Sequence, residues 1–178
     1  DLNPYFRNFL FMVKSRSYPE SIASPMSTLI RIIATFFYIG NIPVAPGTVA
    51  SAAGALLSIA LIDKPVIYLV VLACVFFAGF LTSGRMEEIA KEHDPSCVVI
   101  DEVAGAMITF FWLPLTAPVF ITAFFLFRAF DMFKIFPANR LENLKGGLGI
   151  MSDDIMAGIY ANLLMQIVIR IPDFLPFK

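Results

Sequence analysis

The chain has 178 residues, of which 58% are hydrophobic and only 15% are charged, and its mean hydropathy is +0.79. Thirteen basic and fourteen acidic residues nearly cancel, so the composition offers no basic surface for nucleic acid and excludes an intrinsically disordered chain. The length suits one domain. What remains is an unusually apolar globule or an integral membrane protein.

Four stretches of the sequence contain no charged residue. A helix needs about 20 mostly apolar residues to cross the hydrocarbon core of a bilayer. A chain of this length has too few other residues to cover all four stretches with surface helices. We therefore expect an all-α fold, a compact bundle of about six helices that is membrane-embedded with several transmembrane spans. The stretches are Ile32–Ile62, Pro65–Gly84, Val103–Phe127 and Ile155–Ile169.

The predicted elements follow from proline, glycine and polar breaks along the chain. Residues 1–25 mix aromatic and basic side chains and are expected to form an N-terminal interfacial lead-in. Residues 26–178 are expected to form a single helical domain. Ser152 is the predicted N-cap of the last helix, with Asp153 and Asp154 in its first turn. The expected helices cover about residues 26–38, 48–62, 65–92, 98–113, 118–133 and 152–170.

If these helices cross the bilayer in alternation, ten of the fourteen acidic residues fall on one face. Basic residues such as Arg85, Lys91 and Arg140 lie on the same face, which the positive-inside tendency places in the cytoplasm. This acidic convergence is the main functional signal in the sequence. Its members are Glu87, Glu88, Glu92, Asp94, Asp101, Glu102, Asp131, Glu142, Asp153 and Asp154.

Two motifs begin helices on the acidic face. The loop 42–48 (IPVAPGT) leads into a helix, so the N–H groups of Gly47 and Thr48 can seat a phosphate, with the Ser51 hydroxyl as a further donor. An ordinary Pro-Gly turn would look the same. Asp101 and Glu102 are hard oxygen ligands suited to Mg²⁺. They are equally typical of acids that stabilise a helix N-terminus through its dipole.

Three further features each have two interpretations. Arg128, Asp131 and Lys134 share one helix face, either as an intrahelical salt bridge or as a metal ligand flanked by two phosphate-binding cations. Asp153 and Asp154 are metal ligands or ordinary acids at a helix start. Gly105, one turn after Asp101, leaves room for a ligand or for another helix.

Several phosphatase classes are excluded by what the sequence lacks. His93 is the only histidine, and we expect it to be a solvated surface residue. Lipid phosphatases that use a histidine nucleophile need two histidines. The DxDx[TV] signature of haloacid-dehalogenase-like phosphatases and the longer aspartate array of CDP-alcohol phosphotransferases do not occur either.

Four blocks, in order, resemble the phosphatidylglycerophosphatase A family over about residues 32–170. The family is all-helical, and its members remove the terminal phosphate of phosphatidylglycerophosphate in a Mg²⁺-dependent reaction that yields phosphatidylglycerol. The resemblance therefore implies this lipid substrate, Mg²⁺ as cofactor and the bacterial inner membrane as location. The blocks are IPVAPGT (42–48) with Ser51, Asp94 with VIDEVAG (99–105), RAFDMFK (128–134), and GGLGIMSDDIMAG (146–158).

The resemblance and the acidic convergence together give a site hypothesis, in which one or two Mg²⁺ ions polarise the phosphoryl oxygens and activate an attacking water. An aspartyl-phosphate intermediate stays open, as does the oligomeric state. A small transporter or ion-pathway protein is the alternative, and it predicts carboxylates at mid-membrane depth and on both sides. The predicted metal ligands are Asp101, Glu102, Asp131, Asp153 and Asp154; the catalytic residues are Asp101, Glu102, Asp131 and Asp154; the phosphate-binding residues are Gly47, Thr48, Arg128 and Lys134.

Overall fold

A computed structural model describes residues 25–114, 116–136, 138–141 and 144–170. Within these ranges every regular element is helical, as the sequence predicts. The predicted lead-in, residues 1–25, lies almost wholly outside the described residues, as does Glu142. The elements in order are α2 (Pro25–Ala34), the 3₁₀ helix η2 (Ile39–Asn41), α3 (Pro46–Leu61), α4 (Pro65–Ala90), α5 (Ile100–Phe110), α6 (Ala117–Phe133), α7 (Ala138–Leu141) and α8 (Gly147–Arg170).

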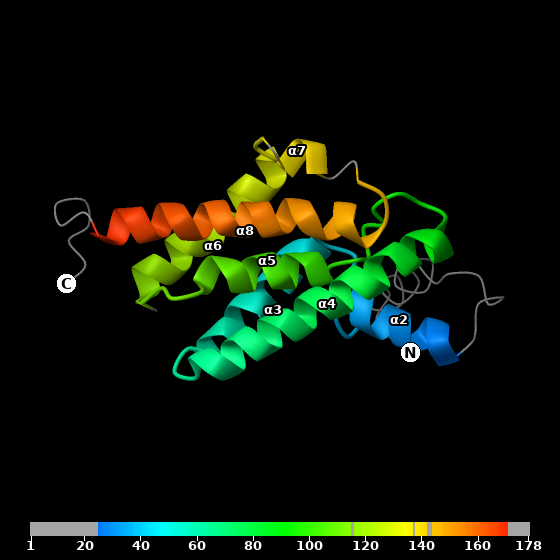
Figure 1. The fold of residues 1–178 in the computed structure, drawn as a ribbon, viewed down its shortest axis with the longest axis horizontal. Helices are drawn as coiled ribbons and strands as arrows, with labels where there is room; N and C mark the ends of the chain where they lie inside the picture. Colours follow the sequence, from blue (N-terminus) through cyan, green and yellow to red (C-terminus); the bar gives the residue numbers. More distant parts are fainter. Residues whose placement is uncertain (1–24, 115, 137, 142–143, 171–178) are drawn as a thin grey trace, which may run out of the picture.

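Helix α5 lies at the centre of the bundle. It packs against α8 and α3 most extensively and also against α4 and α6, so that α8 runs along one side of it and α3 and α4 along the other (Figure 1). Nine of its 11 residues are buried, among them Asp101. A short central helix surrounded on all sides explains why its polar first turn is also enclosed by protein.

Close packing of α5 against α8 depends on two glycines that face each other. A Cβ atom on Gly158 would lie 2.4 Å from the carbonyl oxygen of Gly105, and one on Gly105 would lie 2.6 Å from the carbonyl oxygen of Asp154. Small residues allow two helix backbones to approach this closely. Of the two interpretations of Gly105, the structure therefore supports room for another helix, and this contact brings the acids of α5 and α8 together.

The start of α8 differs from the prediction. Ser152 is not an N-cap: α8 begins at Gly147, and Asp153 and Asp154 lie well inside it rather than in its first turn. The Ser152 hydroxyl lies within hydrogen-bonding reach of the Leu148 carbonyl oxygen. The glycines suggested a turn because glycine disfavours helices. Packing overrides that preference, since a Cβ on Gly147 would lie 2.0 Å from the Phe80 carbonyl oxygen.

Among the described residues, one helix is long and apolar enough to cross a membrane, α4, whose most apolar window has a mean hydropathy of 2.4 and is only 22% buried. The charge-free stretch 103–127 is not one span, because a turn containing Pro114 divides it into α5 and α6. The 11 residues of α5 rise about 16 Å, about half of the roughly 30 Å hydrocarbon core. Helices α2 and α3 are apolar but also shorter than a span.

Candidate active site

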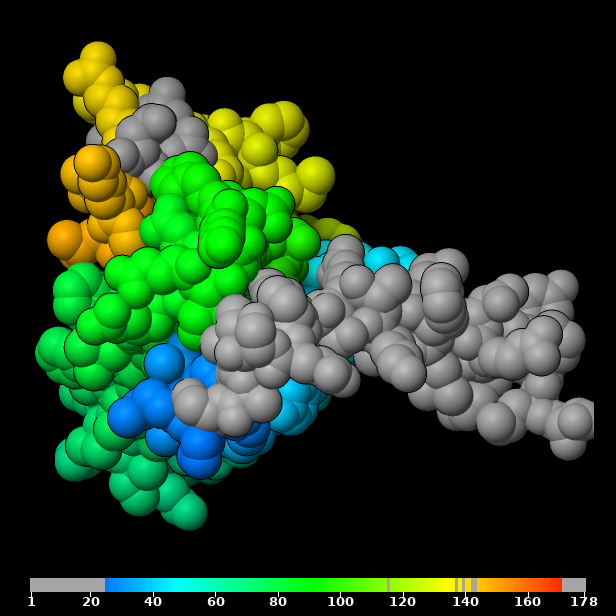
Figure 2. All heavy atoms as spheres, turned by 90° about the vertical axis from the view of Figure 1, so that its right-hand side faces the viewer, coloured from blue at the N-terminus to red at the C-terminus, as the bar shows by residue number. Residues whose placement is uncertain are grey.

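A cavity of about 430 Å³ opens where α3 and α5 begin and α6 ends. Figure 2 looks at the molecule from the end at which α4 finishes, with the connection to α5 in green between α7 in yellow and α2 in blue. All nine residues that the sequence predicts for the site line this one cavity: Gly47, Thr48, Asp101, Glu102, Arg128, Asp131, Lys134, Asp153 and Asp154.

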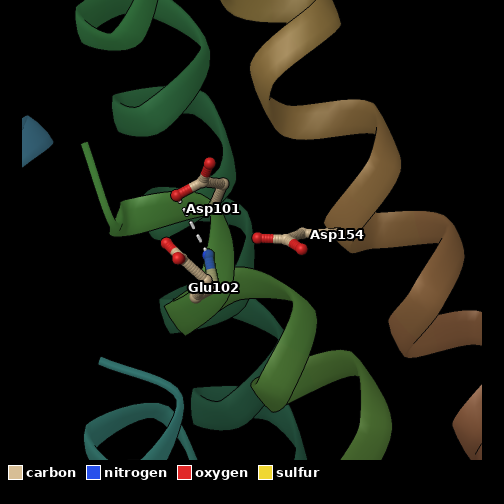
Figure 3. A group of neighbouring side chains, drawn as sticks. All are labelled: Asp101, Glu102 and Asp154. Atoms are coloured by element: carbon tan, nitrogen blue, oxygen red, sulfur yellow. Dashed lines mark hydrogen bonds between the residues drawn. The ribbon is translucent and has the colours of Figure 1, made fainter. Parts of the chain in front are cut away.

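Three carboxylates form the centre of the cavity wall. Asp101 and Glu102 project from the first turn of α5, and Asp154 points towards them from α8 (Figure 3). One carboxylate oxygen from each lies within 4.8 Å of the other two. Asp101 and Asp154 are buried, and the backbone N–H of Glu102 donates a 3.1 Å hydrogen bond to Asp101 Oδ1. This spacing and chemistry suit a hard divalent cation such as Mg²⁺.

Two buried oxygens in this group have no hydrogen-bond partner among the described residues, Glu102 Oε2 and Asp154 Oδ1. A buried acceptor without a donor costs about 1–3 kcal/mol, and more when it is charged. Both atoms belong to the three-carboxylate group, and neither is compensated by a nearby backbone donor. A bound cation would satisfy both, so the residues present fit a metal ion.

The same crowding changes the acidity of these groups, which lie outside the apolar helix α4. Burial, followed by the negative charges of Glu102 and Asp154, raises the pKa of Asp101 well above its ordinary value. Burial and the charges of Asp131 and Glu102 do the same to the pKa of Asp154. Burial also raises the pKa of Asp153, although the ion pair with Lys134 opposes that shift. Negative charge is therefore held at a cost here unless a cation compensates it.

The two cations that line the cavity among the described residues, Arg128 and Lys134, each contact a carboxylate. Arg128 Nη1 lies 2.5 Å from Asp131 Oδ2, so the interpretation as an intrahelical salt bridge holds for this pair. Lys134 pairs with a carboxylate of another helix, because its Nζ lies 2.9 Å from Asp153 Oδ2 of α8. Six carboxylates, those of the predicted acids and Asp94, line the cavity against these two cations.

Helix α3 begins at the cavity with Pro46, two residues before the predicted start at Thr48. Val49 is the first residue whose N–H closes a helical bond, 3.2 Å to the Ala45 carbonyl oxygen. Gly47 and Thr48 therefore belong to the N-terminal turn, where N–H groups attract anions. A Cβ on Gly47 would lie 2.2 Å from Glu102 Oε1, so only glycine lets the carboxylate approach this turn.

Ser51 does not act as the additional phosphate donor that the sequence suggested. Its hydroxyl donates to the Gly47 carbonyl oxygen at 2.8 Å and accepts from Arg128 Nη1 at 3.2 Å, and the residue is fully buried. Ser51 therefore joins the N-terminal turn of α3 to Arg128 instead of facing the cavity.

Sequence reasoning missed several lining residues, including Ser96 and Met132. Their only signal was position, since Met132 lies within the block 128–134 and Ser96 lies two residues after Asp94. The unusual backbone of the site was also missed: Ala45, Asp94 and Lys134 have φ values of 47°, 49° and 43°. Non-glycine residues adopt this left-handed region infrequently, and such residues concentrate at functional sites. His93 lies outside the cavity and contacts the Glu87 carboxylate.

Comparison with known proteins places this cavity in context. The family model for phosphatidylglycerophosphatase A matches residues 32–169, which include all the lining residues within the described part of the chain. A protein of Haemophilus influenzae named phosphatidylglycerophosphatase A is 37% identical over 74% of this chain and 83% of its own length. The protein of that name from Escherichia coli is 33% identical over 75% of this chain and 80% of its own.

A relative with a different name is similar to the same degree. A Bacteroides thetaiotaomicron protein, provisionally named a phosphatidylinositol-3-phosphatase, is 37% identical over 76% of this chain and 91% of its own length. No solved structure matches the chain significantly. Both names describe phosphatases that act on a phosphorylated glycerophospholipid.

Proposed function

The chain belongs to the phosphatidylglycerophosphatase A family and is a phosphatase, and we propose that it is Mg²⁺-dependent and hydrolyses phosphatidylglycerophosphate to phosphatidylglycerol and inorganic phosphate. In this reaction the bond between the terminal phosphorus and the glycerol oxygen breaks, and water supplies the oxygen and the proton that the products need. The observation that carries the proposal is the cavity in which all the predicted residues meet around unpartnered carboxylate oxygens.

The charge of the cavity is the reason for including a metal ion. Among the described residues, six carboxylates and two cations line the cavity, and this excess of acidic groups would disfavour a phosphate dianion without a compensating cation. Asp101, Glu102 and Asp154 would hold the ion, with Asp131 and Asp153 as the adjoining carboxylates. When bound, Mg²⁺ supplies positive charge for the phosphoryl oxygens and lowers the pKa of a water molecule.

The other polar groups of the cavity bind and orient the substrate phosphate. Arg128 can place two N–H groups on a phosphate oxygen pair, and Lys134 adds an ammonium group. The N-terminal turn of α3 at Gly47 and Thr48 adds backbone N–H groups and the positive end of the helix dipole. Together these donors neutralise charge that develops on the phosphoryl group as the ester bond breaks.

The location of the enzyme belongs to the same proposal. We place α4 across the bacterial inner membrane and the remaining helices of the domain, residues 26–178, within the bilayer beside it, as several spans or part-spans. The cavity then opens at the cytoplasmic face, where a phosphorylated lipid headgroup would lie. The exposed apolar side chains of α4, such as Val66, Val70 and Phe77, suit contact with lipid.

The Bacteroides relative supplies a second candidate substrate, a phosphatidylinositol 3-phosphate, because its name describes that activity. The same cavity chemistry would serve both headgroups. The transporter alternative is less well supported, because the carboxylates that line a cavity in the described residues gather at one end of the bundle. An ion pathway would need such groups near mid-depth as well.

The test is a phosphate-release assay on purified protein in detergent micelles. We expect release from phosphatidylglycerophosphate with Mg²⁺, loss of release with EDTA, and recovery when Mg²⁺ is restored in excess. Asp101→Asn should remove most activity, while Asp63→Asn, on the turn before α4, should not. If the protein releases phosphate preferentially from phosphatidylinositol 3-phosphate, that lipid is the substrate instead. Phosphate release in the presence of EDTA would refute the metal assignment.

A further inference from the structure

An apolar pocket lies between the same two helices, α3 and α6, that flank the polar cavity. Its volume is about 350 Å³. We call it the α3–α6 groove; it is lined by Ile59 of α3 and by Ala117, Phe120 and Ile121 of α6. The cavity uses the first turn of α3 and the last turns of α6, whereas the groove uses the opposite end of each helix.

Two rows of side chains run along α3 and α6, each from the cavity end of its helix to the groove. On α3, Ser51, Ala55 and Ile59 recur every four residues, and such residues share one helix face. On α6, Arg128, Phe124 and Phe120 form the corresponding row. The polar members of the two rows, Ser51 and Arg128, are hydrogen-bonded to each other at 3.2 Å. Both rows thus run from a polar contact beside the site to apolar residues in the groove.

The floor of the groove is closed by small and aromatic residues. Ala55, Ala123 and Phe110 are buried in one core cluster, with Phe120 packed against it. The rings of Phe110 and Phe120 stack with centroids 5.0 Å apart. At the rim, Ile59 and Ile121 remain 42% and 55% exposed. The groove is therefore apolar, and its lining residue Phe120 packs on the core cluster of Ala55, Phe110 and Ala123.

The length of this path matches one half of a bilayer. From Thr48 to Ile59 the α3 axis rises about 16 Å, and half of the hydrocarbon core is about 15 Å thick. A chain that starts at a headgroup in the cavity would thus reach the groove within its own leaflet. A partner helix about 10 Å wide is a poorer fit to a pocket lined by four residues.

We propose that the α3–α6 groove binds an acyl chain of the lipid substrate while the headgroup phosphate occupies the cavity. The inference rests on the proposed function, because it needs a lipid phosphate in the cavity. It assigns α3 and α6 as the two helices between which the substrate lies, and the four groove residues as its apolar contacts. Contact with the chain then contributes to selection of a lipid over a soluble phosphate ester.

The experiment fills the groove with a larger side chain and varies the length of the acyl chains of the substrate. Ile121→Trp and Ile59→Trp fill it from opposite helices, and Ile67→Trp is a matched control on α4, where Ile67 is 49% exposed. Each protein is assayed with dipalmitoyl and dihexanoyl phosphatidylglycerophosphate. We expect both groove variants to raise KM for the dipalmitoyl substrate about tenfold, the loss of contact with about two methylene groups.

The remaining outcomes separate the two proposals. The dihexanoyl KM should not change in the groove variants, and the control should not change either KM. Equal effects on both substrates, no effect on either substrate, or the same effect in Ile67→Trp would overturn the groove proposal. These outcomes would also be expected if a second copy of the chain covered the groove. If the wild-type protein releases phosphate from neither lipid, the proposed function itself is wrong. Thermal unfolding of each variant identifies a protein that has failed to fold.

Discussion

The interface between α5 and α8 has polar groups at both ends, but within the described part of the chain these groups are hydrogen-bonded across the interface at only one of the two ends. At the far end, Asn162 of α8 donates to the carbonyl oxygens of Thr109 and Phe111 at 2.9 and 2.7 Å, where α5 ends. At the cavity end, Glu102 Oε2 and Asp154 Oδ1 are buried without a partner among the described residues.

This difference separates a structural from a functional use of polarity in one helix pair. The amide of Asn162 satisfies carbonyl groups that every helix C-terminus leaves open. At the cavity end, by contrast, Glu102 Oε2 and Asp154 Oδ1 have no donor among the described residues, and burial raises the pKa values of Asp101 and Asp154. Unsatisfied polar groups are rare in protein interiors, so a cluster of them indicates a ligand that completes it.

The largest expected effect comes from neutralising the cavity end. Asp154→Asn should lower the rate of phosphate release about 10²–10³-fold, the usual cost of losing one group that stabilises transition-state charge. The melting temperature should not fall, because the change removes a negative charge from a crowded group. A melting temperature that falls together with activity would mean that Asp154 is structural, as Asn162 is.

The close contact of Gly105 with Gly158, which lies between the two ends of the α5–α8 interface, should tolerate substitution poorly. Gly158→Ala would place a Cβ 2.4 Å from the Gly105 carbonyl oxygen, so the helices must separate. Overpacking of this kind typically costs about 1–3 kcal/mol. We expect a lower melting temperature together with reduced activity, measured by thermal scanning and phosphate release. Ala161→Ser, a small change at a buried residue of the same helix, provides a milder comparison.

The far end should respond in stability alone. Asn162→Ala leaves the Thr109 and Phe111 carbonyl oxygens without their donor, at a cost of about 1–2 kcal/mol. Chemical denaturation in detergent should show this loss. The kcat of the folded fraction should stay at the wild-type value, and a fall in kcat would show that the two ends are coupled.

The smallest effect is expected at Ser51, where the cavity end contains a satisfied hydrogen bond. Ser51→Ala frees Arg128 from one contact and should raise KM about fivefold, or about 1 kcal/mol, with kcat nearly unchanged. Ser51→Thr keeps the hydroxyl and should restore KM. An equal loss in both variants would indicate a packing role for this buried position.

Much of this organisation follows from local rules. Periodicity and breaks predict the helices, and four motifs predict all nine residues that meet in the cavity. The alternation of helices explains that success, because residues at successive helix ends must share a side.

What local rules miss is set by packing between distant segments. The predicted start of α8 is wrong because Gly147 packs closely against Phe80 of α4, and no local sequence pattern reveals that contact. The partner of Lys134 was also unpredictable, since Asp153 competes with the nearer Asp131 only after α6 and α8 have packed.

The origin of Asp154 in the last helix has a consequence for biosynthesis. The cavity gathers residues from Ala45 to Asp154, and a chain is made from its N-terminus onward at about 5–20 residues per second. A nascent chain that has completed α5 already carries Asp101 and Glu102, but α8 has yet to be synthesised. The three-carboxylate group and the cover over α5 thus form in the same late event, so the cavity is complete only after α8 has been synthesised and has packed against α5.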